Sequence, residues 1–416
     1  MHIVIITAVY PPEPVVSARM AQDLALGLIQ QGTSVTVLAP QPSRPVTADY
    51  QTLQSPDNVT TLEAGVEVVR LPSYRCPTSR LLPRLAESWS FGRHVCCYLK
   101  KCDEKPDAIY LNSWPLLAQA LIMRYTYKVG IPTVLQIMDI YPESLVHKLP
   151  VWAQTVVAGS LLYLDTQIAK CAKSVVVISE NMRRSYTQTR KLPGEVVKLI
   201  PTWQDDSLFN VSNNRTLACR QYTMRDDLFT FLYLGNIGPV AGVDFLIRAF
   251  YESGLKEAQL IIVGDGSERI RCIEFSLNLG AQNIHFIQDP DAANVPLLQS
   301  MADIFMLPMK HGSAMSSIPS KLPAYLFSGK PVLATVDEES DTASLIRQAK
   351  CGWVGPPEDI CWLAKKMQEV IITPQCELVT LGANGQIFAK NFYSKQKGVR
   401  RLADAIMSAA GRINLW

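Results

Sequence analysis

The chain alternates strand and helix patterns from its first residues, and this alternation limits the folds that are open to it. Residues 2–10 form an apolar, β-branched run, a proline-rich loop covers residues 11–16, and residues 34–39 form a second apolar run. Between them, Ser17 can cap a helix that extends to about residue 31 and is ended by Gly32. A strand, a helix and a second strand in this order predict a βαβ unit, and such units build parallel sheets.

The alternation continues to about residue 179 and begins again near residue 229. Further strands are expected at residues 66–71, 108–112, 131–138 and 174–179, and then at 229–234, 259–263, 284–287, 304–307, 332–335 and 353–354. We therefore predict an α/β fold of two Rossmann-like, doubly wound domains that face a cleft and are joined by a polar segment around residues 203–227. Ligands of open α/β sheets bind beyond the carboxyl ends of the strands, so functional residues should follow strands.

Composition and charge exclude several classes of protein. Of the 416 residues, 48% are apolar and 19% are charged, which is typical of a folded chain. A net charge of +3 is too balanced for a protein that coats nucleic acid. The apolar runs are too short for a transmembrane helix, and the N-terminus resembles a first strand more than a signal peptide. Ten cysteines without a Cys-x-x-Cys pair and five scattered histidines argue against a metal site and suit a reducing cytoplasm.

A lysine-bearing loop in the second series is the most informative candidate site. Lys310 follows a strand, Ser320 suits the start of a helix, and Gly329 ends that helix. Lys321 falls in the first helical turn, where a lone cation is unfavourable unless an anion lies nearby. This pattern indicates a phosphate or diphosphate cradle, and a surface helix with a solvated lysine is the competing interpretation.

Two glycine-containing turns accompany this loop. Gly235, Asn236 and Gly238 follow the first strand of the second series, and Gly264 and Asp265 follow its second strand. Glycine permits the backbone to approach a ligand closely, although many strand-to-helix turns share the pattern. The Asp265 carboxylate can bind a hydroxyl group or simply cap the next helix.

Polar residues also follow strands of the first series. Asp139 comes after a buried strand with Glu143 beside it, and Asn112 and Ser113 end the neighbouring strand. Glu13 lies in the proline-rich first loop. These side chains can hydrogen-bond a polar ligand, and capping of the next turn is the alternative role of Asp139.

Two segments raise the question of a membrane. Residues 70–105 carry eight basic and three acidic side chains among apolar ones, and this equals the whole surplus of positive charge in residues 1–200. Such a segment is typical of a helix at a membrane surface, and a helix that packs its apolar face on the sheet is the alternative. Residues 149–172 predict a very apolar helix, for which a buried position is favoured over membrane contact.

Taken together, these stretches resemble the GT-B glycosyltransferases of family 4, in particular bacterial enzymes that build O-antigen, capsule or colanic-acid repeat units. The matching pieces follow the order of the family and span nearly the whole chain. They are Tyr10-Pro-Pro-Glu13, Gln136-x-x-Asp139, Pro201-Thr-Trp203, Gly235-Asn-Ile-Gly238, Val263-Gly-Asp-Gly266, Pro319-Ser-Lys321 and Gly329-Lys-Pro331.

The resemblance implies an enzyme that transfers a sugar from a nucleotide diphosphate sugar with retention of configuration and without a metal or other cofactor. Residues 1–203 would bind the acceptor, residues 204–390 the nucleotide sugar, and a helix in residues 391–416 would pack back on the first domain. A UDP-linked N-acetylated sugar is favoured as donor and a lipid-diphosphate-linked saccharide as acceptor. The enzyme would be cytoplasmic, bound to the inner face of the cell membrane through residues 70–105, with no nucleic-acid partner.

The resemblance also suggests residue roles. Phe286 and Ile287, at the end of a strand, are expected to flank the base. The candidate catalytic residues are Asp139, Lys321 and Lys310; the candidate donor-binding residues are Gly235, Asn236, Gly238, Gly264, Asp265, Phe286, Ile287 and Ser320; and the candidate acceptor-binding residues are Glu13, Asn112, Ser113 and Glu143.

The chain departs from the family at two places. Most members carry two glutamates eight residues apart near the phosphate loop, where Ser316 and Ala324 stand here, and the second glutamate usually holds the ribose hydroxyls. The arginine and lysine of the family's first loop are replaced by Asn236 and Ala241. We infer that the two lysines of the later loop neutralise the diphosphate in this branch. A nucleotide-sugar 2-epimerase and a non-catalytic GT-B subunit are the alternative functions.

Overall fold

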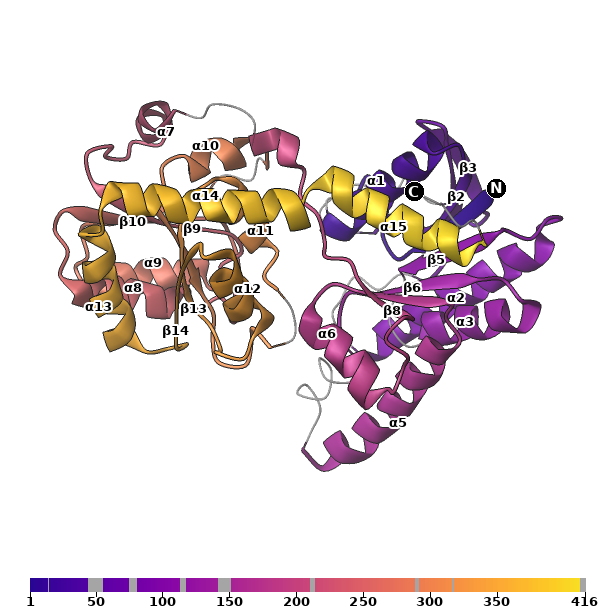
Figure 1. Ribbon diagram of the computed structural model, residues 1–416. Helices are drawn as coiled ribbons and strands as arrows, with labels where there is room; N and C mark the ends of the chain where they lie inside the picture. Colours follow the sequence, from indigo (N-terminus) through magenta and orange to yellow (C-terminus); the bar gives the residue numbers. More distant parts are fainter. Residues whose placement is uncertain are drawn as a thin grey trace. The chain divides into compact units, whose positions relative to one another are not determined.

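The computed structural model describes residues 1–13, 15–43, 55–74, 81–112, 117–140, 151–209, 214–288, 292–315 and 318–411. The chain forms two compact units, Met1–Thr202 with Gln396–Trp416, and Trp203–Lys395 (Figure 1). Each unit is a mainly or wholly parallel sheet between layers of helices. The predicted α/β class with two doubly wound domains is confirmed.

The first unit has an eight-stranded sheet in the order β3-β4-β2-β1-β5-β6-β7-β8, and only the β3–β4 pair is antiparallel. Helices α2, α3, α5 and α6 contribute to the core on one face, and α1 packs on the other. Its strands are β1 (His2–Thr7), β2 (Ser34–Pro40), β3 (Val59–Glu63), β4 (Val66–Leu71), β5 (Ala108–Asn112), β6 (Thr133–Ile137), β7 (Ser174–Val177) and β8 (Val197–Leu199). Its helices are α1 (Val16–Gln30), α2 (Leu81–Lys101), α3 (Leu117–Val129), α5 (Val151–Lys170), α6 (Glu180–Arg184), the π-helix η2 (Ser185–Thr189) and α15 (Lys395–Ala409).

The second unit has a six-stranded, fully parallel sheet in the order β11-β10-β9-β12-β13-β14. Residues of α8, α9 and α13 form the core on one face, and residues of α7, α10, α11, α12 and α14 form the core on the other. Its strands are β9 (Phe229–Leu234), β10 (Ala258–Val263), β11 (Ile284–Ile287), β12 (Ile304–Pro308), β13 (Val332–Thr335) and β14 (Gly352–Gly355). Its helices are η3 (Asp206–Phe209), α7 (Arg215–Gln221), α8 (Val243–Ser253), α9 (Arg269–Asn278), η4 (Ala292–Asn294), α10 (Val295–Gln299), α11 (Lys321–Phe327), α12 (Asp341–Ala349), α13 (Ile360–Ile371) and α14 (Gln375–Phe392).

The C-terminal helix returns to the first unit, as predicted. Helix α15 packs against α1 so closely that a Cβ atom added to Gly27 would lie 2.2 Å from Cγ1 of Val399. Just before this helix, the chain hydrogen-bonds the segment that leaves the first unit: the Gln204 N–H donates to the Tyr393 carbonyl at 2.9 Å, and Ser394 Oγ donates to Asp206 Oδ2 at 3.1 Å. The two segments that connect the units are therefore held side by side.

Three local expectations differ from the structure. Ser17 does not cap α1, because the helix begins at Val16 and Val15 occupies the capping position without a side-chain bond. Strand β3 was not expected, since its exposed residues lack an apolar alternation. The polar segment between the domains contains helix α7, whose Asn214 cap accepts bonds from the N–H groups of Thr216 and Leu217.

Replacement of Gly27 by Ala should destabilise the protein, because a β-branched valine can move little at χ1 and the new methyl group overpacks the α1–α15 contact. We expect a loss of about 1–3 kcal/mol in the free energy of unfolding, measured by urea denaturation. Gly159→Ala on α5 is the matched control, since nothing lies within 4 Å of its added Cβ. Val399→Ala should rescue Gly27→Ala, and a loss unaffected by Val399 would contradict the packing of α15 on α1.

Candidate functional site

Two glycine turns meet at the carboxyl ends of β9 and β10. These strands pair in register, so the turns that follow them lie against each other, with Gly235 N–H donating to the Val263 carbonyl at 3.0 Å. A Cβ at Gly264 would lie 2.1 Å from the Gly235 oxygen, and one at Gly266 would lie 2.3 Å from the Ile237 oxygen. Gly264 and Gly266 are therefore required for the approach of one turn to the other.

Lys321, the first residue of α11, crosses to this pair of turns. Its Nζ lies 2.7 Å from the Tyr233 hydroxyl and 4.0 Å from the centre of the Tyr233 ring. A Cβ at Gly235 would lie 3.1 Å from Lys321 Cε and 3.2 Å from Nζ. The absence of a side chain at residue 235 leaves the slot that the lysine occupies.

The environment of Lys321 disfavours its charged form. Burial lowers the pKa of Lys321 from 10.5 to about 7. Among the described residues, the lysine makes no ion pair that would offset this effect. An anion at the slot would supply the missing counter-charge, because an opposite charge within about 4–6 Å favours the ammonium.

Lys310 contacts the far end of the loop that follows β9, residues 235–242. It follows β12, its N–H donates to the Val240 carbonyl at 3.2 Å, and its Nζ lies 3.5 Å from Asp244 Oδ2 at the start of α8. The two predicted cations thus border one loop, Lys321 where it begins at Gly235 and Lys310 near its end. Lys310 is partly neutralised by Asp244, whereas Lys321 has no such partner in the described part of the chain.

Asp265 lies at the adjacent strand end and does not cap the next helix, whose capping position is Glu268. Its Oδ1 accepts from the Gly266 N–H at 2.8 Å, and its Oδ2 accepts from Gln288 Nε2 at 2.9 Å. Gln288 follows β11 and was missed in the sequence, because an isolated glutamine after a strand carries no distinctive pattern. The exposed Asp265–Gln288 pair offers hydrogen-bonding groups next to the glycine turns.

The remaining donor-site candidates are less favourably placed. Phe286 packs against the core on one face of the sheet and Ile287 against the core on the other, since neighbouring strand residues point in opposite directions. The two side chains therefore cannot both contact one base, and only their backbone groups could do so together. Ser320 is exposed at the start of α11 and its side chain makes no capping bond. Ser316 lies outside the described residues, and Ala324 presents no polar group on α11.

In the first unit, polar residues end three neighbouring strands. Asn112 is the last residue of β5 and pairs in register with Thr7 at the end of β1. Asp139 is exposed two residues after β6, which is the next strand along the sheet. Ser113 and Glu143 lie outside the described residues.

Glu13 lies in the loop after β1 and is buried, with 3% of its surface exposed. Its Oε1 accepts from the Ser43 N–H at 3.1 Å. Arg70 is also buried and donates to the carbonyl oxygens of Pro11 and Pro40. Burial lowers the pKa of Arg70 while the charges of Glu63 and Glu13 raise it. Glu13 and Arg70 together hold the loop that follows β1. Arg70 is therefore not one of the surface cations that we expected in residues 70–105.

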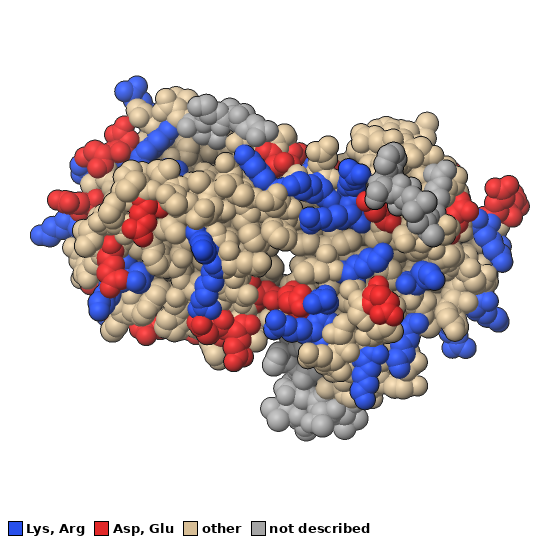
Figure 2. Space-filling model, viewed as in Figure 1, with Lys and Arg blue, Asp and Glu red and all other residues tan. Residues whose placement is uncertain are grey.

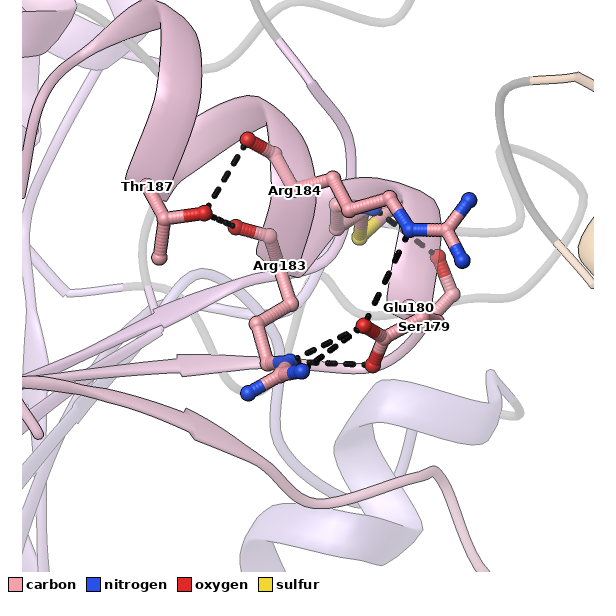
Figure 3. Close-up of polar contacts among 6 residues, drawn as sticks. Ser179, Glu180, Arg183, Arg184 and Thr187 are labelled. Carbon is pink, nitrogen blue, oxygen red and sulfur yellow. Dashed lines mark hydrogen bonds and ion pairs between the residues drawn. The ribbon is translucent and has the colours of Figure 1, made fainter. Parts of the chain in front are cut away.

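A further cluster follows β7 and was not recognised in the sequence (Figure 3). Ser179 caps α6 by accepting from the Met182 N–H at 3.3 Å. Glu180 accepts from Arg183 Nε at 2.9 Å, and Arg184 Nε lies 3.9 Å from its other oxygen. Thr187 closes the turn by donating to the Arg183 carbonyl at 2.9 Å. The cluster places two exposed arginines and one glutamate at the carboxyl edge of the first sheet, with an excess of one positive charge.

The basic segment at residues 70–105 contains α2, whose apolar face belongs to the core. Phe91, Val95 and Leu99 are buried against the sheet, so they are not available to a lipid surface, and the packed-helix alternative is correct for them. Trp89 remains 47% exposed, with the Arg93 guanidinium 4.7 Å from its ring centre. Arg75 and Arg80 lie outside the described residues. Figure 2 shows Lys and Arg side chains spread over one face of the first unit.

The apolar helix α5 is not buried on all sides. Asp165, Ile168 and Ala169 are buried, whereas Tyr163 is 68% exposed. No helix among the described residues is long and apolar enough to cross a membrane. Within the same residues, no group of three or more His, Cys, Asp or Glu side chains is arranged to hold a metal ion.

Comparison with known proteins identifies relatives of both units. The model of the Glycosyl transferase 4-like domain matches residues 17–203, and that of the Glycosyl transferases group 1 domain matches residues 215–387. The probable glycosyltransferase WbjE of Pseudomonas aeruginosa is 22% identical over 300 residues, which is 72% of each chain. The putative colanic acid biosynthesis glycosyl transferase WcaI of Escherichia coli K12 is 27% identical over 362 residues, 83% of this chain and 86% of WcaI.

Solved structures share the fold. HepE of Anabaena, crystallised in complex with UDP, superposes with a TM-score of 0.70 at 18% identity, over 98% of this chain and 100% of HepE.

Proposed function

Because the chain belongs to the glycosyltransferases, with a family 4-like first domain, a group 1 second domain and the GT-B fold, we propose that it moves a sugar from a nucleotide diphosphate sugar to a lipid-linked saccharide in the synthesis of a bacterial surface polysaccharide. WcaI is described as a colanic acid biosynthesis enzyme, which supports the proposed pathway class. HepE was crystallised with UDP, which supports a UDP-linked donor.

The slot of Lys321 is the observation that carries the proposed donor site. The lysine lies 2.7 Å from the Tyr233 hydroxyl, beside backbone turns that only glycine permits, and has no counter-charge in the described part of the chain. A diphosphate is compact, carries negative charge and accepts hydrogen bonds, so it matches an amine beside exposed backbone. Lys310, at the other end of the loop, is suited to the second phosphate.

The proposed chemistry follows from the charge that develops. When the bond between the anomeric carbon and the diphosphate oxygen breaks, negative charge grows on the diphosphate and positive charge on the sugar ring. Placed cations stabilise the leaving group, and such electrostatic stabilisation is usually the largest catalytic contribution. The departing phosphate accepts the proton of the acceptor hydroxyl, and the new bond retains the configuration of the sugar. No metal is required in this proposal.

Replacement of Lys321 by Ala should therefore abolish most activity. Loss of one oxyanion-type donor costs about 2.7–4 kcal/mol, or roughly 10²–10³ in kcat. Transfer to a lipid-diphosphate acceptor, read by mass spectrometry over a panel of UDP- and GDP-sugars, measures this loss. Lys365→Ala, an exposed lysine on α13, is the charge-matched control and should behave as the wild type.

The outcome of this assay also separates the alternatives. Near-normal turnover of Lys321→Ala would remove the lysine from the mechanism. An isomerised nucleotide sugar without a glycoside product would favour a 2-epimerase, and a wild-type protein that binds no nucleotide would favour a non-catalytic subunit.

Asp139 is the proposed acceptor-side group. Its carboxylate lies at the edge of the first sheet, where it can orient the acceptor hydroxyl or stabilise the positively charged ring. Asp139→Asn keeps the shape and removes the charge, so we expect normal unfolding behaviour and a loss of about 10²-fold or more in transfer. Asp57→Asn, at another exposed aspartate of this unit, should leave transfer unchanged. A fully active Asp139→Asn enzyme would exclude the residue from the reaction.

Membrane association is proposed to use the exposed basic side chains of α2 and not its apolar face. Each Lys or Arg near an anionic surface contributes about 1 kcal/mol. Joint replacement of Arg93, Lys100 and Lys101 by Gln should therefore weaken co-sedimentation with vesicles of anionic lipid by about 10²-fold at low salt. The control replaces three exposed lysines of the second unit, Lys256, Lys350 and Lys365, by Gln. Equal binding by the two triple variants would contradict a specific role of α2.

A further inference from the structure

Tyr233 makes three contacts that converge on the Lys321 slot. It is the penultimate residue of β9 and is fully buried. Its hydroxyl donates to the Asn236 carbonyl at 2.6 Å, lies 2.7 Å from Lys321 Nζ, and its ring centre lies 4.0 Å from the same nitrogen. A phenol has one proton, which is used on Asn236, so the oxygen must accept a hydrogen bond from the lysine.

Hydrogen bonds from Tyr325 hold β9 and α11, the two elements that carry this contact, against each other. The Tyr325 hydroxyl of α11 accepts from the Leu234 N–H and donates to the Leu234 carbonyl, both at 2.8 Å. The Tyr325 ring stacks on Phe305 with centres 4.2 Å apart. Tyr325 thereby joins the end of β9 to α11, and Tyr233 and Lys321 are each carried by one of these two elements. The packing of β9 against α11 therefore determines where the Lys321 amine lies, unlike the amine of a lysine at the protein surface.

The titratable neighbours of the amine are uncharged. Tyr233 faces it from β9, Tyr325 lies on its own helix, and Cys272 of α9 is within electrostatic range of Tyr233. Burial raises the pKa of both tyrosines, and it raises the pKa of the Cys272 thiol to about 11. Four charged groups also act on the pKa of Cys272: Asp244, Glu268, Arg271 and Lys310. Their charges are two negative and two positive, so they leave no net charge.

We propose that Tyr233 is the positioning residue of Lys321, and that binding of the donor diphosphate converts the tyrosine-held amine into an ammonium by the uptake of one proton from solvent. This inference rests on the proposed function. The nitrogen gains one proton and no other bond changes. Tyr233 acts through Lys321 and does not itself touch the donor.

The sign of the pH effect follows from the burial of the lysine. Burial brings the pKa of Lys321 to about 7 in the free protein, and a bound diphosphate must raise it, because the anion favours the ammonium. Between these two values each bound donor takes up a proton. The affinity for the diphosphate should therefore fall above about pH 7, by up to about tenfold for each pH unit until the raised pKa of the bound state is reached.

The test is calorimetric titration of the full-length protein with UDP. At pH 8, measurements in buffers of different ionisation enthalpy report the number of protons taken up. The wild type should take up close to one proton per UDP, whereas Lys321→Arg, which is charged throughout, should take up almost none. Tyr233→Phe retains the ring and loses the oxygen, so we expect about tenfold weaker UDP binding and an earlier fall of affinity with pH. Tyr251→Phe, at an exposed tyrosine of α8, is the matched control.

The outcomes distinguish the inference from the proposed function. UDP binding without proton uptake by the wild type would overturn the inference, and this measurement requires no variant to fold. So would a Tyr233→Phe protein with wild-type affinity and pH dependence. Failure of the wild type to bind UDP, GDP or their sugars at any pH would overturn the proposed function and the inference with it.

Discussion

Lys321 is withdrawn from water against the ring and hydroxyl of Tyr233, and no carboxylate among the described residues compensates this loss of hydration. The other features of the proposed donor site depend on this placement. A side chain at Gly235 would crowd Lys321 Cε and Nζ, and Gly264 must lack a side chain so that the neighbouring turn can approach the Gly235 carbonyl. An uncompensated buried amine is costly to the free protein, and an anionic ligand relieves that cost.

This arrangement fits a unit with little positive charge. Residues 201–416 carry 20 basic and 22 acidic side chains, so attraction by bulk charge does not hold an anionic donor there. A few placed groups must do so. Most of the family carries an arginine and a lysine in the first loop of this domain, where Asn236 and Ala241 stand here. We propose that Lys321 of α11, which lies against Gly235 of this loop, takes over their role together with Lys310. The slightly negative net charge of residues 201–416 is compatible with an anion site that depends on a few placed cations.

Much of the fold follows from the sequence because strands and helices alternate with clear apolar runs and glycine stops. The glycine turns and Lys310 could be singled out in the sequence because they follow strands, and Lys321 because a lone cation is unfavourable in the first turn of a helix. Tyr233 was not, because a tyrosine inside an apolar strand is indistinguishable in sequence from an ordinary core residue. Arg70 was misplaced for the opposite reason: its charge suggests the surface, while the loop carbonyls and Glu13 that hold it come from distant parts of the chain. Phe91 and Val95 are buried in the core, and their sequence pattern would be the same if a lipid surface covered this face of the helix.

The titration of Lys321 itself tests the account most directly. Protein labelled with ¹³C at lysine Cε gives one NMR signal per lysine, and the signal absent from Lys321→Arg identifies this residue. The account predicts that the Lys321 signal titrates near pH 7 in the free protein and at clearly higher pH when UDP is saturating. A Lys321 signal that titrates near the ordinary lysine value of about 10.4, or one that UDP leaves unchanged, would contradict a donor site built on a buried amine.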